Sequence, residues 1–503
     1  MAGQALTIAT EAEVARLSRL ARAVPAAVVR GGEAEIHGIT CDSRRVTPGA
    51  LFVAIPGLAQ DGRTYIDDAL RRGAAAVVCQ DTPPVLDCPV VQVNDARAAL
   101  AAMARSFFAA PDESLTTVGI TGTNGKTTTA LLLAAAMDAA GLDTGVVGTL
   151  GTGGGGTFTP GSHTTPEAPE LYAALDAMRT AGKKAAVLEV SSHALALKRV
   201  QGMQFDVAVF TNLTRDHLDF HHNMQDYFAA KALLFQGLPP HAAMAVNLDD
   251  PFGTRLISPA RTRVVTYGHT PRADVVLLDT VSTAAGLRIR MRLPGGEVVI
   301  ESALLGRTNV ANIMAAMAAA CALNLDIHAA AAGIGSVKSI PGRAERIDEG
   351  QDFLVLVDYA HTDDALMQIL GAARELTDQR LMVVFGCGGD RDKSKRSLMG
   401  AAAGRLADVA YLTSDNPRSE DPLAILAQVE AGYRQQPGSC EPILEPDRAA
   451  AITAAIKAAR PGDVLVIAGK GHESEQILAH GRIHFDDRDI ARKALRHRLG
   501  KGA

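Results

Sequence analysis

The chain has 503 residues, 47% of them apolar, and a formal net charge of −5 at pH 7. One hydrophobic core does not extend over this length, so about three domains are expected. The small net charge excludes a global basic field that would attract nucleic acid or an anionic membrane surface. The six cysteines are scattered without a C-x-x-C pair, which indicates neither a zinc site nor a disulfide framework.

The N-terminal segment has no basic stretch followed by an apolar run and a small-residue cleavage site, so no export signal is predicted. Elsewhere no stretch approaches about 20 uninterrupted apolar residues. A cytoplasmic protein with no membrane insertion is therefore expected.

Three α/β segments follow one another along the chain. Residues 1–112 carry short apolar runs at 51–55, 74–79 and 89–93, typical of a small α/β domain. Residues 113–341 alternate strands at 117–120, 186–190, 207–210 and 244–246 with helical stretches such as 130–140, which favours a mostly parallel, doubly wound sheet. Residues 342–503 repeat this pattern, with strands at 353–357, 381–385, 409–412 and 464–467.

A β-hairpin is predicted near the end of the second segment. Apolar residues alternate with Arg288, Arg290 and Arg292, and Pro294, Gly295 and Gly296 then turn the chain into residues 298–300. The alternation predicts a half-exposed strand, and we interpret its arginines as a solvated face rather than an anion site.

The most specific motif lies between a β-branched strand and an Ala/Leu-rich helix, and it comprises Gly119, Gly122, Thr123, Asn124, Gly125, Lys126, Thr127 and Thr128. In this context a phosphate loop turns its backbone N–H groups and the helix N-terminus toward an anion. Lys126 would reach the β- and γ-phosphates of a nucleotide, and Thr127 would bind Mg²⁺. Ile120 stands where the strict pattern has glycine, so this is a variant loop.

A second glycine pattern, formed by Gly151, Gly153 and Gly156, matches the dinucleotide fingerprint. That fingerprint needs a helix directly afterwards, but residues 157–169 contain three prolines. We therefore interpret the region as a flexible loop.

Further polar groups follow the predicted parallel strands. Glu189 ends one strand and His217 follows the next, so both are expected to face the nucleotide crevice. Ser191, Ser192 and His193 would also suit a hydrolase nucleophile, but the Gly-x-Ser-x-Gly motif is absent. Lys231 lies in a helical stretch of apolar and small residues, where the default interpretation is a snorkelling surface lysine.

Taken together, the motifs resemble the Mur ligase family over nearly all of the chain. The resemblance is carried by Asp42-Ser43-Arg44, the phosphate loop, His163-Thr164-Thr165-Pro166, Glu189 to His193, Asp216-His217-Leu218-Asp219, Gly306 to Asn312, Pro341-Gly342-Arg343, Asp358 to His361, Gly386 to Arg391, Asp415-Asn416-Pro417-Arg418 and Gly469 to Glu473. So many motifs in one order make the resemblance highly specific.

The resemblance implies a three-domain, ATP-dependent ligase of peptidoglycan precursor synthesis that needs Mg²⁺. It would join meso-diaminopimelate to UDP-N-acetylmuramoyl-L-alanyl-D-glutamate through an acyl phosphate. The first domain would hold the UDP end, the second ATP, and the third the amino acid. Glu189, His217 and Thr127 would serve Mg²⁺, and Lys231 would react with CO₂ to form a carbamate beside it.

The resemblance also implies three groups of ligand contacts. ATP contacts outside the loop would come from Asn309, Arg343 and Asp358. Contacts with the UDP-muramoyl dipeptide would come from Cys41, Ser43, Leu58, Ala59, Gln60, His163, Thr164, Thr165, Ser191, Leu197 and Arg199. The diaminopimelate pocket would comprise Arg391, Asp415, Asn416, Pro417, Arg418, Gly469 and Glu473. Leu197 departs from the family pattern, which usually has glutamine there.

Three other functions fit part of these patterns. A related ligase such as a folylpolyglutamate synthase would not need the segment from Asp415 to Arg418 or the motif around Ser43. A P-loop switch or motor would release phosphate without either small substrate. A non-catalytic UDP-sugar-binding protein would explain neither Lys126 nor Glu189.

Overall fold

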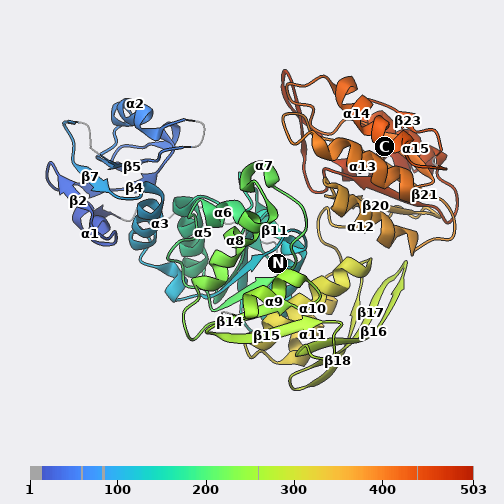
Figure 1. The fold of residues 1–503 in the computed structure, drawn as a ribbon, viewed down its shortest axis with the longest axis horizontal. Helices are drawn as coiled ribbons and strands as arrows, with labels where there is room; N and C mark the ends of the chain where they lie inside the picture. Colours follow the sequence, from blue (N-terminus) through green and yellow to red (C-terminus); the bar gives the residue numbers. More distant parts are fainter. Residues whose placement is uncertain (1–13, 58–59, 82–84, 259, 439, 502–503) are drawn as a thin grey trace.

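The computed structural model describes residues 14–57, 60–81, 85–258, 260–438 and 440–501. Three of the five sheets have five or more strands, and Figure 1 shows the units built on these three, with the central one between the other two. The predicted α/β class and its three-part architecture are confirmed. Leu58 and Ala59 lie outside the described residues.

The first sheet has five strands in the order β2-β7-β6-β5-β4, all parallel except β2. Its strands are β2 Val28–Arg30, β4 Gly38–Thr40, β5 Ala50–Ala54, β6 Ala76–Gln80 and β7 Val90–Val93, with helices α1 Leu17–Arg22, α2 Ile66–Arg71 and α3 Ala96–Phe107. A small two-stranded sheet pairs β1 Ala15–Arg16 with β3 Glu35–Ile36. The three strands predicted here all form, displaced by at most two residues.

The central sheet has eleven strands in the order β11-β10-β9-β12-β8-β13-β14-β15-β16-β17-β18. Neighbouring strands from β9 to β16 run parallel. These are β8 Thr116–Thr121, β9 Thr144–Gly148, β12 Ala185–Glu189, β13 Val207–Phe210, β14 Ala243–Asn247, β15 Arg263–Gly268 and β16 Val275–Thr283. Strands β12, β13 and β14 are nearly continuous, fully buried apolar runs because helices cover both faces of the sheet there.

One face of this sheet packs against α4 Lys126–Ala139, α10 Arg307–Ala322 and α11 Ile327–Ser336. The other face packs against α5 Ala168–Thr180, α6 Ser192–Ala196 and α8 Met224–Gln236, in a core that continues into α3 of the first unit. Short helices α7 Leu218–His221 and α9 Pro251–Ile257 complete the unit.

The predicted hairpin forms from β17 Gly286–Leu293 and β18 Gly296–Ser302. Arg288 and Arg290 are exposed and pair with Glu301 and Glu297, at 3.0 and 3.8 Å. The interpretation as a solvated face is confirmed.

The loop predicted around Gly151 is wrong for residues 151–159. Strands β10 Gly151–Gly154 and β11 Thr157–Thr159 form an antiparallel hairpin at the sheet edge. Gly155 and Gly156, with φ of 59° and 86°, supply the left-handed pair that a tight two-residue turn requires. The three prolines exclude a helix over residues 157–169, but they do not exclude strands that end at Thr159, before the first proline. The exclusion of a dinucleotide fingerprint holds, since the next helix starts only at Ala168.

The third sheet has six strands in the order β19-β20-β24-β21-β22-β23, parallel except for β19. Its strands are β19 Glu345–Ile347, β20 Leu354–Asp358, β21 Leu381–Phe385, β22 Val409–Leu412, β23 Ile443–Leu444 and β24 Val464–Ala468. Helices α12 Asp363–Arg374, α13 Ser394–Leu406 and α14 Pro422–Arg434 cover one face, and α15 Arg448–Ala458 and α16 Asp487–Arg498 cover the other. A hairpin of β25 Glu475–Leu478 and β26 Gly481–His484 lies beside it.

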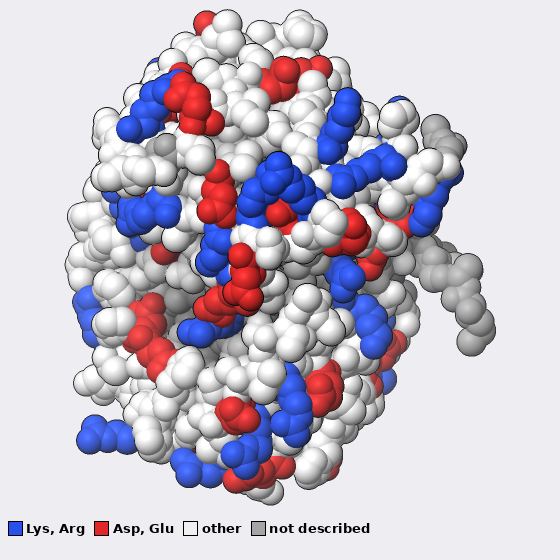
Figure 2. All heavy atoms as spheres, turned by 90° about the vertical axis from the view of Figure 1, so that its right-hand side faces the viewer, with Lys and Arg blue, Asp and Glu red and all other residues white. Residues whose placement is uncertain are grey.

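Lys and Arg alternate with Asp and Glu over the face seen in Figure 2, as the composition predicts. Among the described residues, no helix is both long and apolar enough to cross a membrane.

Candidate functional site

The phosphate loop connects β8 to α4 at the carboxyl edge of the central sheet. Gly125, with φ of 88°, is the residue before α4, and no side chain caps the helix there. A Cβ at Gly125 would collide with Asn312, and one at Gly122 with Thr211. The loop therefore packs as closely as glycine allows and leaves the helix N–H groups for an anion. Lys126 Nζ lies over the loop, donating to the carbonyls of Gly122 and Thr123 at 2.8 Å each.

A buried carboxylate stands beside the loop. Glu189, only 1% exposed, ends β12, which pairs with β8. It accepts hydrogen bonds from the hydroxyl of Thr127 at 2.9 Å, and from the backbone and hydroxyl of Thr149 at 2.8 and 3.0 Å. The structure thus brings Thr127 and Glu189 together as predicted. Thr149 was missed, because only strand pairing brings it here.

These groups fit Mg²⁺, which prefers hard oxygen ligands and keeps phosphate oxygens or water in its shell. No group of three or more His, Cys, Asp or Glu side chains suited to a metal occurs in the described part of the chain. A cation here would therefore be held by the Thr127 hydroxyl, the Glu189 carboxylate and the phosphates of a bound nucleotide.

Lys231 is 1% exposed, so the default interpretation as a snorkelling surface lysine is wrong. Its Nζ donates to the carbonyl of Gly122 at 2.8 Å and lies 4.6 Å from the ring centroid of Tyr227. Burial, and next the charge of Lys126, hold the pKa of Lys231 well below its ordinary value. Its neighbourhood disfavours an ammonium ion.

His217 lies outside the Thr127–Glu189 pair. It precedes α7 in a left-handed conformation, and its Nε2 is 3.3 Å from Asp216. Its ring packs edge-on against His193, with centroids 4.8 Å apart. The direct contacts of its ring are thus with Asp216 and His193, and its role at a metal stays a prediction.

The phosphate loop is also contacted by residues that follow the central sheet. Arg343 stacks on Tyr359, 4.6 Å from the ring centroid, and donates to the Thr127 hydroxyl at 3.1 Å. Asn124 donates to Asp364 on α12 at 3.2 Å. Both contacts tie the loop to the third unit, and Asp364 was missed because nothing in its local sequence marks it.

Asn309 and Asp358 serve as local braces in this structure. Asn309 donates to the Leu305 carbonyl at 2.8 Å and accepts from Asn312 at 3.1 Å. Asp358 accepts the backbone N–H groups of Ala344 and Ala360, at 2.7 and 2.8 Å. Asp358 thereby orients the turn that carries Arg343.

A cavity of about 430 Å³ opens between the central and third units. Asp216 and His217 line it from the central side, and Tyr359 and His361 lie near the junction. Its other wall contains six of the seven residues predicted for the amino-acid pocket, namely Arg391, Asp415, Asn416, Arg418, Gly469 and Glu473. Pro417 is buried within the same segment.

Lys470 is a buried cation behind this wall that sequence reasoning missed. It is fully buried and donates to Asn416 Oδ1 at 3.0 Å and to Glu473 Oε2 at 3.2 Å. Its Nζ also lies 3.7 Å from Asp415 Oδ1, a buried atom without a hydrogen-bond partner. Lys470 thus holds Asp415 and Glu473 in place and partly neutralises their charge.

Four residues predicted for the dipeptide form one connected group beside Glu189. Thr165 donates to the Glu189 carbonyl at 2.8 Å and accepts from the Ser191 backbone at 3.0 Å. Thr164 is 3.1 Å from Thr149 through their hydroxyls, and Arg199 donates to the Thr165 carbonyl at 3.0 Å. His163 is exposed and Leu197 ends α6 nearby.

The residues predicted for the UDP end come from the first unit. Ser43 is buried and Cys41 half-buried, and Arg45 of the same segment pairs with Glu170 on α5. Gln60 is exposed and contacts Tyr65. The segment around Ser43 therefore faces the central unit.

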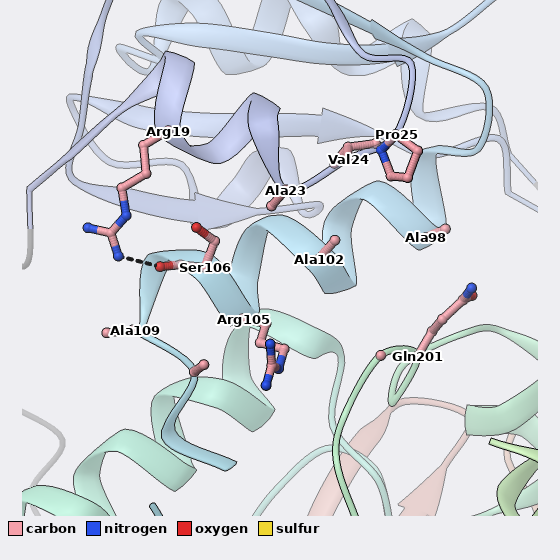
Figure 3. A pocket seen from close by; sticks show the side chains of 12 residues that line it. Arg19, Ala23, Val24, Pro25, Ala98, Ala102, Arg105, Ser106, Ala109 and Gln201 are labelled. Carbon is pink, nitrogen blue, oxygen red and sulfur yellow. Dashed lines mark hydrogen bonds between the residues drawn. The ribbon is translucent and has the colours of Figure 1, made fainter. Parts of the chain in front are cut away.

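A larger hollow of about 620 Å³ lies where α1 and α3 meet residues 201–202 (Figure 3). Its arginines are already engaged: Arg19 donates to the Ser106 carbonyl at 2.7 Å, and Arg105 pairs with Asp112 at 2.9 Å and Glu113 at 2.7 Å. No residue of the phosphate loop or of the predicted amino-acid pocket lines this hollow, and neither does Glu189. The phosphate loop and the smaller cavity remain the candidate site.

A phosphate loop with a buried carboxylate, facing a cavity that carries both signs of charge, defines a nucleotide-dependent enzyme of the P-loop α/β class. Family models match residues 35–108 (Mur ligase family, catalytic domain), 120–320 (Mur ligase middle domain) and 342–471 (Mur ligase, glutamate ligase domain). The chain belongs to the Mur ligase family.

Two curated relatives are named UDP-N-acetylmuramoyl-L-alanyl-D-glutamate--2,6-diaminopimelate ligase. The protein of Solibacter usitatus is 50% identical over 92% of this chain and 94% of its own. That of Geobacter metallireducens is 44% identical over 97% and 99%. A solved structure with the same enzyme name is 35% identical, with a TM-score of 0.65 over 92% of this chain and 95% of its own. The MurF ligase of Thermotoga maritima in complex with ADP, 22% identical with a TM-score of 0.64 over 92% of this chain and 98% of its own, shares the fold.

Proposed function

We propose that this protein is an ATP-dependent ligase that adds meso-diaminopimelate to UDP-N-acetylmuramoyl-L-alanyl-D-glutamate in peptidoglycan precursor synthesis. The observation that carries the proposal is the cavity between the central and third units, with Arg391 and Arg418 on the wall of the third unit beside Asp415 and Glu473. An amino acid with a second carboxylate and a second ammonium matches these charges. Relatives at 50% and 44% identity bear the name of this activity.

Each unit has a separate role in this proposal. Residues 1–112 bind the UDP end through Cys41, Ser43 and the segment that ends at Gln60. Residues 113–341 bind ATP and the dipeptide, and residues 342–503 bind the amino acid. The reaction takes place in the cytoplasm, where ATP and the UDP-linked precursor are available.

The first chemical step converts a poor acyl donor into a reactive one. An oxygen of the D-Glu γ-carboxylate attacks the γ-phosphorus, the bond to the bridging oxygen breaks, and ADP leaves. Lys126 and the α4 N-terminus stabilise charge on the transferred phosphoryl group, while Arg343 orients Thr127 at the loop. Bound Mg²⁺ would neutralise phosphate charge as a Lewis acid held by Thr127 and Glu189.

In the second step, the neutral amine of diaminopimelate attacks the acyl carbon, and the tetrahedral intermediate collapses to the amide with loss of phosphate and release of the amine proton. Thr164, Thr165, Ser191 and Arg199 hold the dipeptide so that its acyl carbon stays beside the loop. The wall with Arg418 holds the amino acid from the opposite side. Positioning of this kind supplies much of the rate enhancement in two-substrate reactions.

We further propose that Lys231 carries a carbamate when active. Carbamate formation needs a neutral amine and CO₂, and the lowered pKa of Lys231 favours the neutral amine. The product is an anion in place of a neutral amine. It would accept hydrogen bonds from water bound to Mg²⁺, a role that a buried ammonium cannot fill.

The test is a panel of amino acids, each incubated with ATP and UDP-N-acetylmuramoyl-L-alanyl-D-glutamate. Phosphate release and the mass of the product are followed together. We expect meso-diaminopimelate to give one phosphate per amide formed. Phosphate release without the two small substrates would indicate a switch or motor, and preference for a folate acceptor a different ligase.

A further inference from the structure

Two loops of the third unit, residues 386–392 and 414–420, are joined side by side at the cavity wall. The Gly389 backbone donates to the Asn416 carbonyl at 2.9 Å, and Arg418 Nη1 donates back to the Gly389 carbonyl at 2.6 Å. The Ser419 hydroxyl donates to Asp390 at 2.7 Å. A Cβ at Gly389 would collide with the Pro417 carbonyl. The two loops therefore behave as one unit.

Each loop holds one non-glycine residue in the left-handed region, Asp390 with φ of 53° and Arg418 with φ of 52°. Such conformations persist only where neighbouring contacts impose them. The Arg418 backbone donates to the Ile477 carbonyl at 3.0 Å. The Asp390 backbone donates to Glu420 Oε1 at 2.7 Å. Glu420 thus binds Asp390 directly, and it lies two positions after Arg418 in the chain.

Glu420 is held in turn by Arg396, a fully buried residue of α13. The guanidinium binds both carboxylate oxygens, at 3.0 and 2.9 Å, in a two-point pair. It also donates to Gln428 at 3.0 Å and to the Gly388 carbonyl at 3.2 Å. Hydrogen bonding to Arg396 lowers the pKa of Glu420 to about 2, so the carboxylate stays ionised. An ion pair between a fully buried arginine and a partly exposed carboxylate thus connects α13 to both loops.

Arg418 needs this support because it shares the cavity wall with Arg391. Burial, and next the charge of Arg391, lower the pKa of Arg418. Two neighbouring guanidinium groups repel each other, and a free Arg418 side chain would turn away toward solvent. Without substrate, the Gly389 carbonyl holds it on the wall, and the loop pair sets where that carbonyl lies.

We propose that Arg396 and Glu420 are positioning residues for amino-acid selection, which act by fixing the loop pair so that Arg418 faces the distal carboxylate of the substrate. This inference rests on the proposed function and deepens it. Neither residue lines the cavity, and neither was singled out by any motif in the sequence. Their effect is transmitted through Arg418.

A double-mutant cycle tests this transmission. We expect Glu420→Gln to raise KM for meso-diaminopimelate about 10-fold, since a charged hydrogen-bond partner is lost. The KM values for ATP and the UDP-linked substrate should stay within about twofold of wild type. In an Arg418→Ala background, Glu420→Gln should change kcat/KM for meso-diaminopimelate by less than about twofold, because its effect depends on Arg418.

Glu441→Gln is the matched control, because Glu441 forms an exposed ion pair with Arg434 in the same unit; it should leave every KM unchanged. Ser419→Ala removes only the exposed hydroxyl bond to Asp390, so it keeps the inference testable if Glu420→Gln folds poorly. We expect it to raise the same KM about threefold, again only when Arg418 is present.

The inference is overturned if Glu420→Gln changes kcat/KM for the amino acid equally with and without Arg418. A parallel rise in the KM for ATP would also overturn it, because that result indicates a general structural defect. The proposed function is tested on wild type alone. The double-mutant cycle, by contrast, compares the variants with whichever amino acid the wild type accepts as substrate. Failure of the proposed function can therefore be told from failure of the positioning role.

Discussion

Replacing Arg418 with alanine is expected to remove a two-point contact with the distal carboxylate of meso-diaminopimelate. Arg418 is half-buried, lines the cavity and lies near Arg391, so water replaces its interaction with the carboxylate poorly. Each hydrogen bond between charged groups contributes about 1.5–3 kcal/mol. Two such bonds amount to about 3–6 kcal/mol, so kcat/KM should fall by roughly 10² to 10⁴.

The assay measures kcat/KM for meso-diaminopimelate and for L-lysine, which lacks the distal carboxylate, in wild type and variant. Wild type should reject lysine strongly, because lysine leaves Arg418 without its anion. The variant should lose this discrimination without becoming a good lysine enzyme, since Asp415 and Glu473 remain in place. Arg405→Ala, at an exposed position on α13, is the control. The reasoning is refuted if wild type uses lysine equally well, or if the variant keeps its preference.

Three further variants test the nucleotide side of the site. Lys126→Ala should lower kcat by roughly 10² to 10³ by removing charge stabilisation at the phosphoryl group, measured as phosphate release, with the thermal unfolding midpoint as the check on folding. Lys231→Arg introduces a permanent cation that cannot form a carbamate, so kcat should fall by about 100-fold at saturating Mg²⁺. A bare lysine side chain in electron density of an active, ATP-bound enzyme would disprove the carbamate. Gly148→Ala places a Cβ against the Glu189 carboxylate. It should therefore raise the Mg²⁺ concentration needed for half-maximal activity by about 10-fold. The control is Gly371→Ala, which has open space around its Cβ and should leave this Mg²⁺ concentration unchanged.

Much of the fold could be predicted because buried parallel strands are short apolar runs with clear ends. The strands Val207–Phe210, Leu381–Phe385 and Val409–Leu412 begin and end where the sequence predicts. The hairpin of β10 and β11 was missed because its strands are short, rich in glycine and lie at a sheet edge. There, pairing with β9 rather than local preference decides the structure.

Lys231 shows where interpretation of single residues fails. A lone lysine among apolar residues was interpreted as exposed, but the whole segment from Tyr227 to Phe235 is apolar or small apart from this lysine. Lys231 lies four residues after Tyr227 and four before Phe235, which are both buried, whereas Leu233 on the other side of α8 is exposed. Residues spaced by four share one face of a helix, so this spacing would have predicted the burial without any family resemblance.

The buried cations of the third unit lie beyond what local sequence can predict. Arg448 pairs with Asp487 with both side chains fully buried, and the partners are 39 positions apart. Arg396 and Lys470 are equally buried. Each has the residue type of a surface position, and only the packed structure shows that a carboxylate lies within reach.

The loop contacts explain how two separately folded parts can share one reaction. Thr127 and Asn124 belong to the phosphate loop, yet their partners Arg343 and Asp364 follow the central sheet in the chain. Phosphates bound at the loop would compete for Arg343 and so change the contact that holds the third unit against it. The two contacts thus join the phosphate loop to the unit whose cavity wall carries Arg418. Amide formation requires both sites to be aligned at once, and these two contacts link that alignment to the nucleotide.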